Sequence, residues 1–293
     1  MLLFSYLLIS GVTTGALYAL VALGLVVVNK ATGVINFAQG EFFMFAGFVA
    51  WTLHVQFGMN YPLSFLLAVV VGFVLGALTD RIAFRPIDKN DIVSLVLATV
   101  GISFMLKGLA RVIWGGKADY LSFPPITSPD PIMVGPIMVI PQQLAVLAGT
   151  LIIMLVFAAF FRLTRAGKMM QATADNARAA RLVGIRTDHI YTLAFGTGAA
   201  IAGAAAVLTA PLTLLYPDIG FTFFLKGFAA AVLGGLTSLP GAVLGGLIVG
   251  VVESLAGGYI HSSVMELSPF VVIMIVLVFK PTGLLSFHKA RRV

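Results

Sequence analysis

The chain has 293 residues, of which 60% are hydrophobic and 10% charged, and its mean hydropathy is +1.06. Soluble domains carry about 25% charged residues, so this composition excludes a soluble enzyme and predicts one membrane domain over residues 1–293. The net charge of +7 is better explained by basic residues on the cytoplasmic side of a membrane than by nucleic-acid binding. No cysteine is present and the four histidines lack ligand spacing, so we expect no disulfide, metal site or cofactor.

Apolar runs predict four spans in the first half of the chain: Met1 to Val28, Thr32 to Val55, Tyr61 to Thr79 and Ile92 to Ile113. The first run has no positive charge before Lys30, whereas a cleavable signal peptide carries positive charge ahead of its apolar run. We therefore expect the first span to be retained in the mature protein.

The second half begins with a Pro-rich connection from Trp114 to Pro141, and then predicts further spans at Gln142 to Phe161, Ile190 to Ala210 and Pro269 to Leu285. The stretch from Phe221 to Ile260 is interrupted at Gly234 to Gly241, and its first piece is shorter than the about 20 residues that cross a bilayer. It is predicted as a re-entrant pair or as two short spans. The fold class is thus an all-α polytopic membrane protein with about eight hydrophobic transmembrane segments, broken or re-entrant helices included.

The distribution of Lys and Arg predicts the orientation of these spans. Fourteen of the eighteen fall on one side when Lys30, the 81–91 loop, the 162–189 loop and the carboxyl-terminal tail are placed together. The other four are Lys107, Arg111, Lys117 and Lys226. Because basic loops stay in the cytoplasm, the amino terminus is predicted outside and the carboxyl terminus inside.

The basic segment from about residue 162 to 189 contains an Ala-rich stretch that predicts a short helix outside the membrane, with Gly184 as a left-handed cap. A simple connector would need only a few residues, so the length favours a surface that a partner binds. The alternative is a solvated loop whose charge only fixes topology. The residues predicted to couple this segment to a partner are Ala172, Asp175, Arg178, Ala179, Arg181 and Gly184.

Two interruptions of the apolar pattern, at Thr32 to Glu41 and at Gly234 to Gly241, predict broken helices at membrane depth. Broken helices expose backbone groups that lipid cannot satisfy, so they line a cavity or pack inside protein. The candidates for a translocation pathway are Asn36, Gln39, Glu41, Thr99, Ser103, Thr237 and Ser238.

Structural alternatives compete with these pathway assignments. Glu41 could pair with Lys30 or cap a helix start near the cytoplasmic mouth. Asn36 and Gln39 could satisfy freed backbone groups instead of touching a solute. Glu253 could be an interface residue near the outer surface.

Four motifs resemble one family when they are taken together. The stretch Gly33-Val34-Ile35-Asn36-Phe37-Ala38-Gln39-Gly40-Glu41 is similar to a signature of LivH-type permeases of branched-chain amino acid ABC importers, with Gln39 in place of the commoner His. The stretches 233–246, Arg181 to Ile185 and Lys280 to Leu284 resemble that family's carboxyl-terminal signature, coupling loop and ending. They occur in the expected order over nearly the whole chain.

This resemblance implies a permease subunit of an ATP-driven importer in the bacterial inner membrane. It implies two ATPase subunits, a second related permease and a periplasmic binding protein as partners. Catalysis is expected on the ATPases, since the chain has no GxxxxGK[ST] phosphate loop and offers no catalytic residues. The expected cargo is a branched-chain amino acid; the alternatives are urea, short amides or sugars, or a secondary transporter that works alone.

Overall fold

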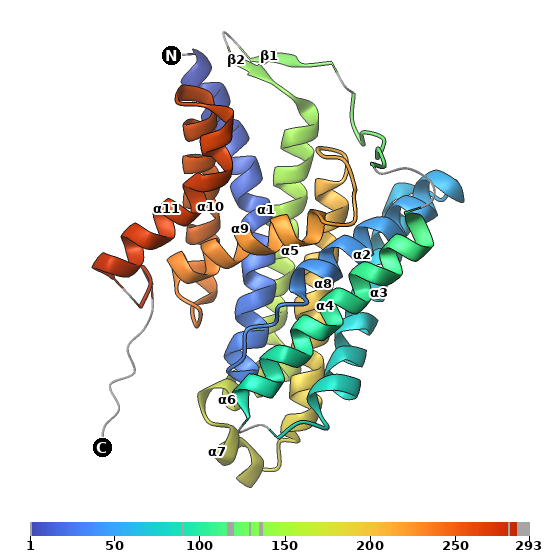
Figure 1. The fold of residues 1–293 in the computed structure, drawn as a ribbon, viewed down its shortest axis with the longest axis vertical. Coiled ribbons are helices and arrows are strands. Elements are labelled where there is room, and N and C mark those ends of the chain that lie inside the picture. The colour runs from blue at the N-terminus through green and yellow to red at the C-terminus, as the bar shows by residue number, and fades with distance from the viewer. Residues whose placement is uncertain are drawn as a thin grey trace.

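The computed structural model describes residues 2–88, 91–115, 120–128, 130–134, 137–280 and 282–285, and these are mostly helical (Figure 1). Among them, seven helical stretches are long and apolar enough to cross a membrane. They comprise α1 (Leu2–Thr32), α3 (Tyr61–Thr79) with its π-helical continuation η2 (Asp80–Phe84), α4 (Ile92–Trp114), α5 (Pro141–Leu163), α8 (Thr187–Thr209), α10 (Leu239–Tyr259) and α11 (Ser262–Phe279).

Shorter elements complete the fold. The helices α2 (Gln39–Trp51), which continues as the π-helical turn η1 (Thr52–Gln56), and α9 (Ile219–Gly234) are embedded among the long helices. The short helices α6 (Arg165–Asp175) and α7 (Ala177–Leu182) lie at one end of the molecule. The amino terminus and an antiparallel hairpin of β1 (Ile132–Val134) and β2 (Ile137–Val139) lie at the opposite end (Figure 1).

Helix α1 is the centre of the bundle, and every residue from Ala16 to Val28 is buried. It packs antiparallel to α10 through glycines: a Cβ on Gly250 would lie 2.3 Å from the Cα of Gly15, and one on Gly246 would lie 2.6 Å from the Cα of Ala19. Small residues let helix backbones approach this closely, which is the usual way helices associate where lipid removes the hydrophobic driving force.

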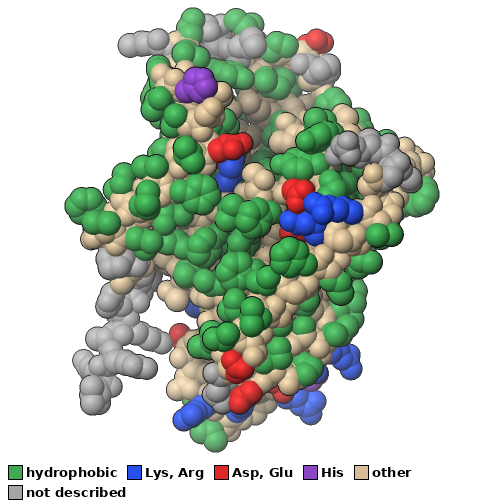
Figure 2. All heavy atoms as spheres, in the orientation of Figure 1, with side chains coloured by type: hydrophobic (Ala, Val, Ile, Leu, Met, Phe, Trp, Pro, Cys, Tyr) green, Lys and Arg blue, Asp and Glu red, His purple; other side chains and the backbone are tan. Residues whose placement is uncertain are grey.

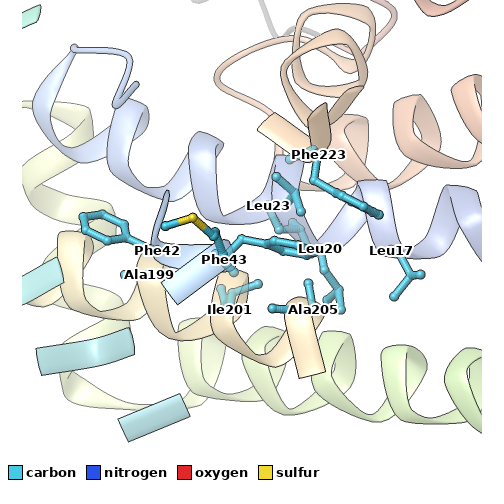
Figure 3. Close-up of a cluster of buried hydrophobic side chains, with 14 of the residues drawn as sticks. Leu17, Leu20, Leu23, Phe42, Phe43, Ala199, Ile201, Ala205 and Phe223 are labelled. Carbon is cyan, nitrogen blue, oxygen red and sulfur yellow. The ribbon is translucent and has the colours of Figure 1, made fainter. Parts of the chain in front are cut away.

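The two short helices meet inside the bundle. A Cβ on Gly40 at the start of α2 would lie 2.2 Å from the carbonyl oxygen of Gly220 at the start of α9. Phe43 of α2 stacks on Phe223 of α9 with ring centroids 4.6 Å apart. Figure 3 shows these two rings beside Leu17, Leu20 and Leu23 of α1 in a continuous apolar core. The beginnings of the two short helices α2 and α9 are therefore packed against each other at the centre of the protein.

The outer faces of several helices carry exposed apolar side chains. Val112 of α4 is 83% exposed and Val278 of α11 is 77% exposed. Figure 2 shows hydrophobic side chains over most of the visible face, with Lys and Arg side chains at its lower end and in two places higher up, each beside an acidic side chain. Such a surface is stable only against lipid or another apolar protein surface, which defines a polytopic membrane protein.

The predicted fold class is confirmed, and α3 has the predicted bounds. In the 221–260 stretch, α9 is too short to span a membrane and α10 is long enough. The beginning of α9 and the end of α10 are directed toward the end of the molecule that holds the amino terminus. There Leu215 pairs with Leu121, and the Ser254 hydroxyl donates to the Leu7 carbonyl. The hairpin of β1 and β2 was not predicted. The basic tail after residue 285, and Pro281 in the ending motif, lie outside the described residues.

Candidate functional site

The predicted coupling segment forms two short helices, where the sequence predicted one. The reason is Asn176, whose extended backbone ends α6 and whose Oδ1 accepts from the backbone N–H groups of Arg178 and Ala179, both at 3.0 Å. An Asn at the N-cap satisfies free N–H groups and starts a new helix. Gly184 follows α7 with φ +88°, the left-handed conformation that its sequence position predicted.

The outer surface of α6 and α7 is exposed. Leu182 at the end of α7 is 90% exposed and the adjacent Val183 is 76% exposed. The buried Ala180 anchors α7, and the Arg181 Nε donates to the Thr187 hydroxyl of α8 at 2.8 Å. The remaining predicted coupling residues, all exposed, are Ala172, Asp175, Arg178 and Ala179. The pair of helices thus presents two exposed aliphatic side chains, Leu182 and Val183, among basic ones. Its other side is hydrogen-bonded to α8.

The break between α1 and α2 is held by polar side chains. Gly33 turns the chain with φ +77°. The Asn36 Oδ1 accepts from the Ala38 N–H at 3.1 Å, and the Gln39 Nε2 donates to the Gly198 carbonyl of α8 at 2.8 Å. The Phe37 N–H donates to the Thr99 hydroxyl of α4 at 3.2 Å. The side chains of Asn36, Gln39 and Thr99 therefore hold the interrupted backbone inside protein.

Glu41 belongs to a charged cluster that joins α2, α4 and the start of α9. Its Oε1 accepts from the Ser103 hydroxyl at 3.1 Å and lies 3.8 Å from the Lys107 Nζ. Lys107 in turn lies 3.0 Å from Asp218, which also pairs with Arg111 at 3.1 Å. The buried Glu41 thus has a cation from another helix, and Asp218 connects that cation to the loop before α9.

The alternative pairing of Glu41 with Lys30 is wrong. Lys30 lies in the last turn of α1, where its Nζ is 6.0 Å from the centre of the Phe161 ring of α5. Glu41 is in the first turn of α2, but the N-cap position, Ala38, receives no side-chain cap. The contact between Lys107 and Glu41 was not predicted from the sequence. Two cations one helical turn apart inside an apolar span, Lys107 and Arg111, were the available signal.

The second interruption places its polar residues differently. Ser238 is the N-cap of α10 and its Oγ accepts from the Gly241 N–H at 3.1 Å. Thr237 is exposed. Among the described residues, no hydrogen bond joins either of them to the break between α1 and α2, so the two groups of predicted pathway residues form separate sites.

Glu253 of α10 is 1% exposed and pairs with Lys226 of α9, with Oε1 and Nζ 2.5 Å apart. Glu253 is thus buried between two helices. The Lys226 Nζ also lies 5.4 Å from the centre of the Tyr18 ring of α1. This ion pair therefore ties α9 and α10 to α1.

Two cavities open beside α1. The N-terminal cavity, of about 440 Å³, is lined by α1 from Ser10 to Tyr18 and by residues of α5, α8, α9, α10 and α11, with Lys226 and Glu253 in its wall. The α6-side cavity, of about 410 Å³, is lined by Leu23 and Lys30 of α1, by α5 and by Leu239, Pro240 and Val243 at the start of α10, with Arg162 and Gln171 beside them.

An apolar barrier separates the two cavities along α1. Leu17 and Phe223 line the N-terminal cavity, Leu23 lines the α6-side cavity, and Leu20 is fully buried between them. Figure 3 shows these side chains packed together. Of the residues predicted for a pathway, none lines either cavity.

The described residues form seven helices long and apolar enough to span a membrane, two short helices that meet at their beginnings, and cavities on both sides of an apolar barrier, an arrangement that suits a membrane transport protein. The family described as branched-chain amino acid transport system / permease component matches residues 7–279. The chain belongs to this family of membrane permease components.

Individual relatives agree with this assignment. The high-affinity branched-chain amino acid transport system permease protein LivH of Salmonella typhimurium is 31% identical over 97% of this chain and 96% of its own length. The corresponding protein BraD of Pseudomonas aeruginosa is 31% identical over 98% of this chain and 97% of its own. A solved structure of PsaBC from Streptococcus pneumoniae in complex with Fab covers 96% of this chain with a TM-score of 0.55 at 13% identity, which shows a shared fold.

Proposed function

We propose that this chain is the permease subunit of an ATP-driven importer that moves branched-chain amino acids across the bacterial inner membrane. Residues 1–293 form one transmembrane permease domain. ATP is bound and hydrolysed on two separate ATPase subunits, a second related permease completes the pathway, and a periplasmic binding protein delivers the amino acid. Membership of the permease family supports the transport role, and the names of relatives that are 31% identical over nearly their whole length support the cargo.

The observation that carries the coupling proposal is the exposed pair α6 and α7. A membrane subunit without a nucleotide site needs a rigid surface through which a soluble motor acts. Leu182 and Val183 offer an apolar contact, and the Arg181–Thr187 bond connects α7 to the spanning helix α8. We assign the coupling contact to Ala172, Asp175, Arg178, Ala179, Arg181 and Gly184, together with Leu182 and Val183.

The proposed orientation puts α6 and α7 in the cytoplasm and the amino terminus outside. The described basic residues at the end with α6 and α7 support it under the positive-inside rule: Lys30, Arg81, Arg85, Arg162, Arg165, Lys168, Arg178, Arg181 and Arg186. In this orientation the N-terminal cavity faces outward and the α6-side cavity faces inward. Motion that opens one cavity and closes the other across the Leu20 barrier constitutes alternating access.

We propose that the translocation pathway runs through the two cavities. Asn36, Gln39, Thr99 and Ser103 hold the broken segment and Glu41 is paired with Lys107, so we assign them to positioning α2 within the bundle. Ser238 caps α10, and Thr237 lies beside it next to the α6-side cavity residues Leu239 and Pro240.

Uptake of labelled leucine by cells with and without the partner ATPase genes tests the function. We expect uptake to vanish when the ATPases are deleted. Uptake that survives the deletion would favour a transporter that works alone. Calorimetry of the binding protein with leucine, urea, short amides and sugars identifies the cargo, and binding of a sugar or urea in place of leucine would overturn the amino-acid assignment.

A further inference from the structure

The N-terminal cavity contains chemistry that the coupling mechanism does not use. Its wall includes the Lys226–Glu253 ion pair and several hydroxyl groups, among them those of Thr13, Tyr18, Tyr216 and Thr222. Its apolar wall includes Leu17, Ile140 and Phe223. Small-molecule sites are typically concave and of a few hundred Å³, with apolar walls and a few placed polar groups, and this cavity has those properties.

Two acceptor atoms of this wall have no hydrogen-bond partner in the described part of the chain. They are the Oε2 of Glu253 and the Oε1 of Gln143, both buried. A buried carboxylate oxygen without a donor costs free energy, so its persistence at a cavity wall points to a donor that arrives from the cavity. The Nζ of Lys226, bonded to the other oxygen of Glu253, supplies a positive charge in the same wall.

We propose that this cavity is a binding site for a zwitterionic aliphatic α-amino acid within the permease itself, with Lys226 and Glu253 as its recognition pair. The inference rests on the proposed function and adds a site in the membrane subunit to the one in the binding protein. The ammonium group of the amino acid donates to the Glu253 Oε2, with Gln143 as a second acceptor, and its carboxylate accepts from Lys226. The aliphatic side chain lies against Leu17 and Phe223.

Charge balance explains why this site takes zwitterions. The ion pair is neutral and so is the amino acid, so the four charges alternate in sign and no net charge is added to the low-dielectric interior. A ligand with a carboxylate but no ammonium group, or with an ammonium group but no carboxylate, brings an unbalanced charge into the N-terminal cavity. Leu17 and Phe223 also belong to the barrier below the cavity, so a bound side chain lies against the groups that must move for the path to open.

The absence of cysteine from the chain makes a direct test practical. In the Thr222→Cys variant, a single thiol lies in the cavity wall one helical turn before Lys226. The assembled transporter is placed in lipid nanodiscs without its binding protein, and the rate of alkylation by a small thiol reagent is measured with and without L-leucine. At a leucine concentration of about twice the dissociation constant, alkylation is expected to slow about threefold.

Matched controls separate binding from other effects. The Ala158→Cys variant places the thiol in the α6-side cavity, where leucine is expected to give no protection. 4-Methylpentanoate, which lacks the ammonium group, and 3-methylbutylamine, which lacks the carboxylate, are expected to give no protection of the thiol at position 222. These ligand controls leave the ion pair intact, so they do not depend on how well a variant folds.

Variants of the pair complete the experiment. In the Thr222→Cys background, Lys226→Met and Glu253→Gln are expected to lose the protection by leucine, whereas Lys226→Arg and Glu41→Gln are expected to keep it. The proposal is overturned if leucine does not protect, if the two analogues protect as well as leucine, or if folded Lys226→Met and Glu253→Gln variants keep full protection. Leucine uptake by the intact wild-type system is measured in parallel. Normal uptake without protection refutes the permease site alone, whereas absence of amino-acid uptake refutes the proposed function.

Discussion

Buried charges are the residues on which this protein differs most from a simple apolar bundle. Glu41 and Glu253 are each 1% exposed, and each meets a lysine of another helix, Lys107 or Lys226. Removing one member of a buried pair leaves the other charge without compensation, which is far more costly than replacing both. The two pairs differ in surroundings, since Lys226 and Glu253 line a cavity and Glu41 does not.

Lys107 forms ion pairs with two carboxylates, those of Glu41 and Asp218, so its loss is expected to lower stability more than the loss of Glu41. The Lys107→Met change leaves Glu41 and part of Asp218 unpaired and is expected to cost about 3–5 kcal/mol of stability. Glu41→Gln keeps Lys107 paired with Asp218, 3.0 Å away, and is expected to cost less. Melting temperatures of the purified variants in detergent measure the difference, and equal losses would contradict this hierarchy.

Glu41→Gln also tests whether this residue contacts the cargo. Because Glu41 lines neither cavity and joins α2 to α4, we expect the change to lower the maximal uptake rate or the amount of assembled transporter. The apparent affinity and the preference among amino acids are expected to stay the same. A large change in substrate preference would place Glu41 in the pathway.

Among the elements, the spanning helices were predictable and their partners were not. Long apolar runs such as Tyr61 to Thr79 predict helices because hydropathy is a local property, and Gly184 predicts a left-handed cap because only its own backbone matters. Which lysine meets Glu41 depends on how α2 and α4 pack. The split of the coupling segment depended on Asn176, an N-cap signal that an Ala-rich helical pattern obscured.

The close contact of α1 and α10 predicts a sharp difference between two glycines. In Gly250→Ala the new Cβ meets Gly15 at 2.3 Å, so the helices must separate, and overpacking of this kind costs about 1–3 kcal/mol. Gly108→Ala on α4 places its Cβ where nothing lies within 4 Å and is expected to be neutral or slightly stabilising. Thermal unfolding of both variants in nanodiscs checks this, and equal melting temperatures would refute close α1–α10 packing.

The cap between α6 and α7 is testable by itself. Asn176→Ala removes both hydrogen bonds to the first turn of α7 and is expected to destabilise that helix by about 1 kcal/mol. Asn176→Asp keeps an acceptor oxygen and serves as the matched control. Amide hydrogen exchange over residues 177–182 should rise in the first variant and not in the second; unchanged exchange in both would show that the cap does not hold α7.

The junction between α7 and α8 is expected to carry coupling. Gly184→Pro cannot adopt the φ of +88°, and Arg181→Glu removes the bond to Thr187, so both should disconnect α7 from α8. The chain should still insert, because its spans are unchanged. We expect leucine uptake to be lost while the ATPases retain hydrolysis without stimulation by the loaded binding protein. Normal transport and normal stimulation in both variants would disprove the coupling role.

As a whole molecule, the protein is a bundle whose two cavities are separated by one apolar barrier, and we propose that its basic end receives force from a soluble partner. The N-terminal cavity, the Leu20 barrier and the α6-side cavity all lie along α1. The coupling helices pack against the opposite end of the bundle from the amino terminus (Figure 1). In the proposed mechanism, movement of α6 and α7 is transmitted through helices that also line the two cavities.

Labelling of a single cysteine at the coupling surface tests this account most directly. In the Leu182→Cys variant, the thiol replaces a side chain that is 90% exposed at the end of α7. We predict that a membrane-impermeant reagent labels it from the cytoplasmic side only, and that assembly with the ATPase subunits protects it. Labelling from the external side, or labelling from inside that is equally fast with and without the ATPases, would contradict the account.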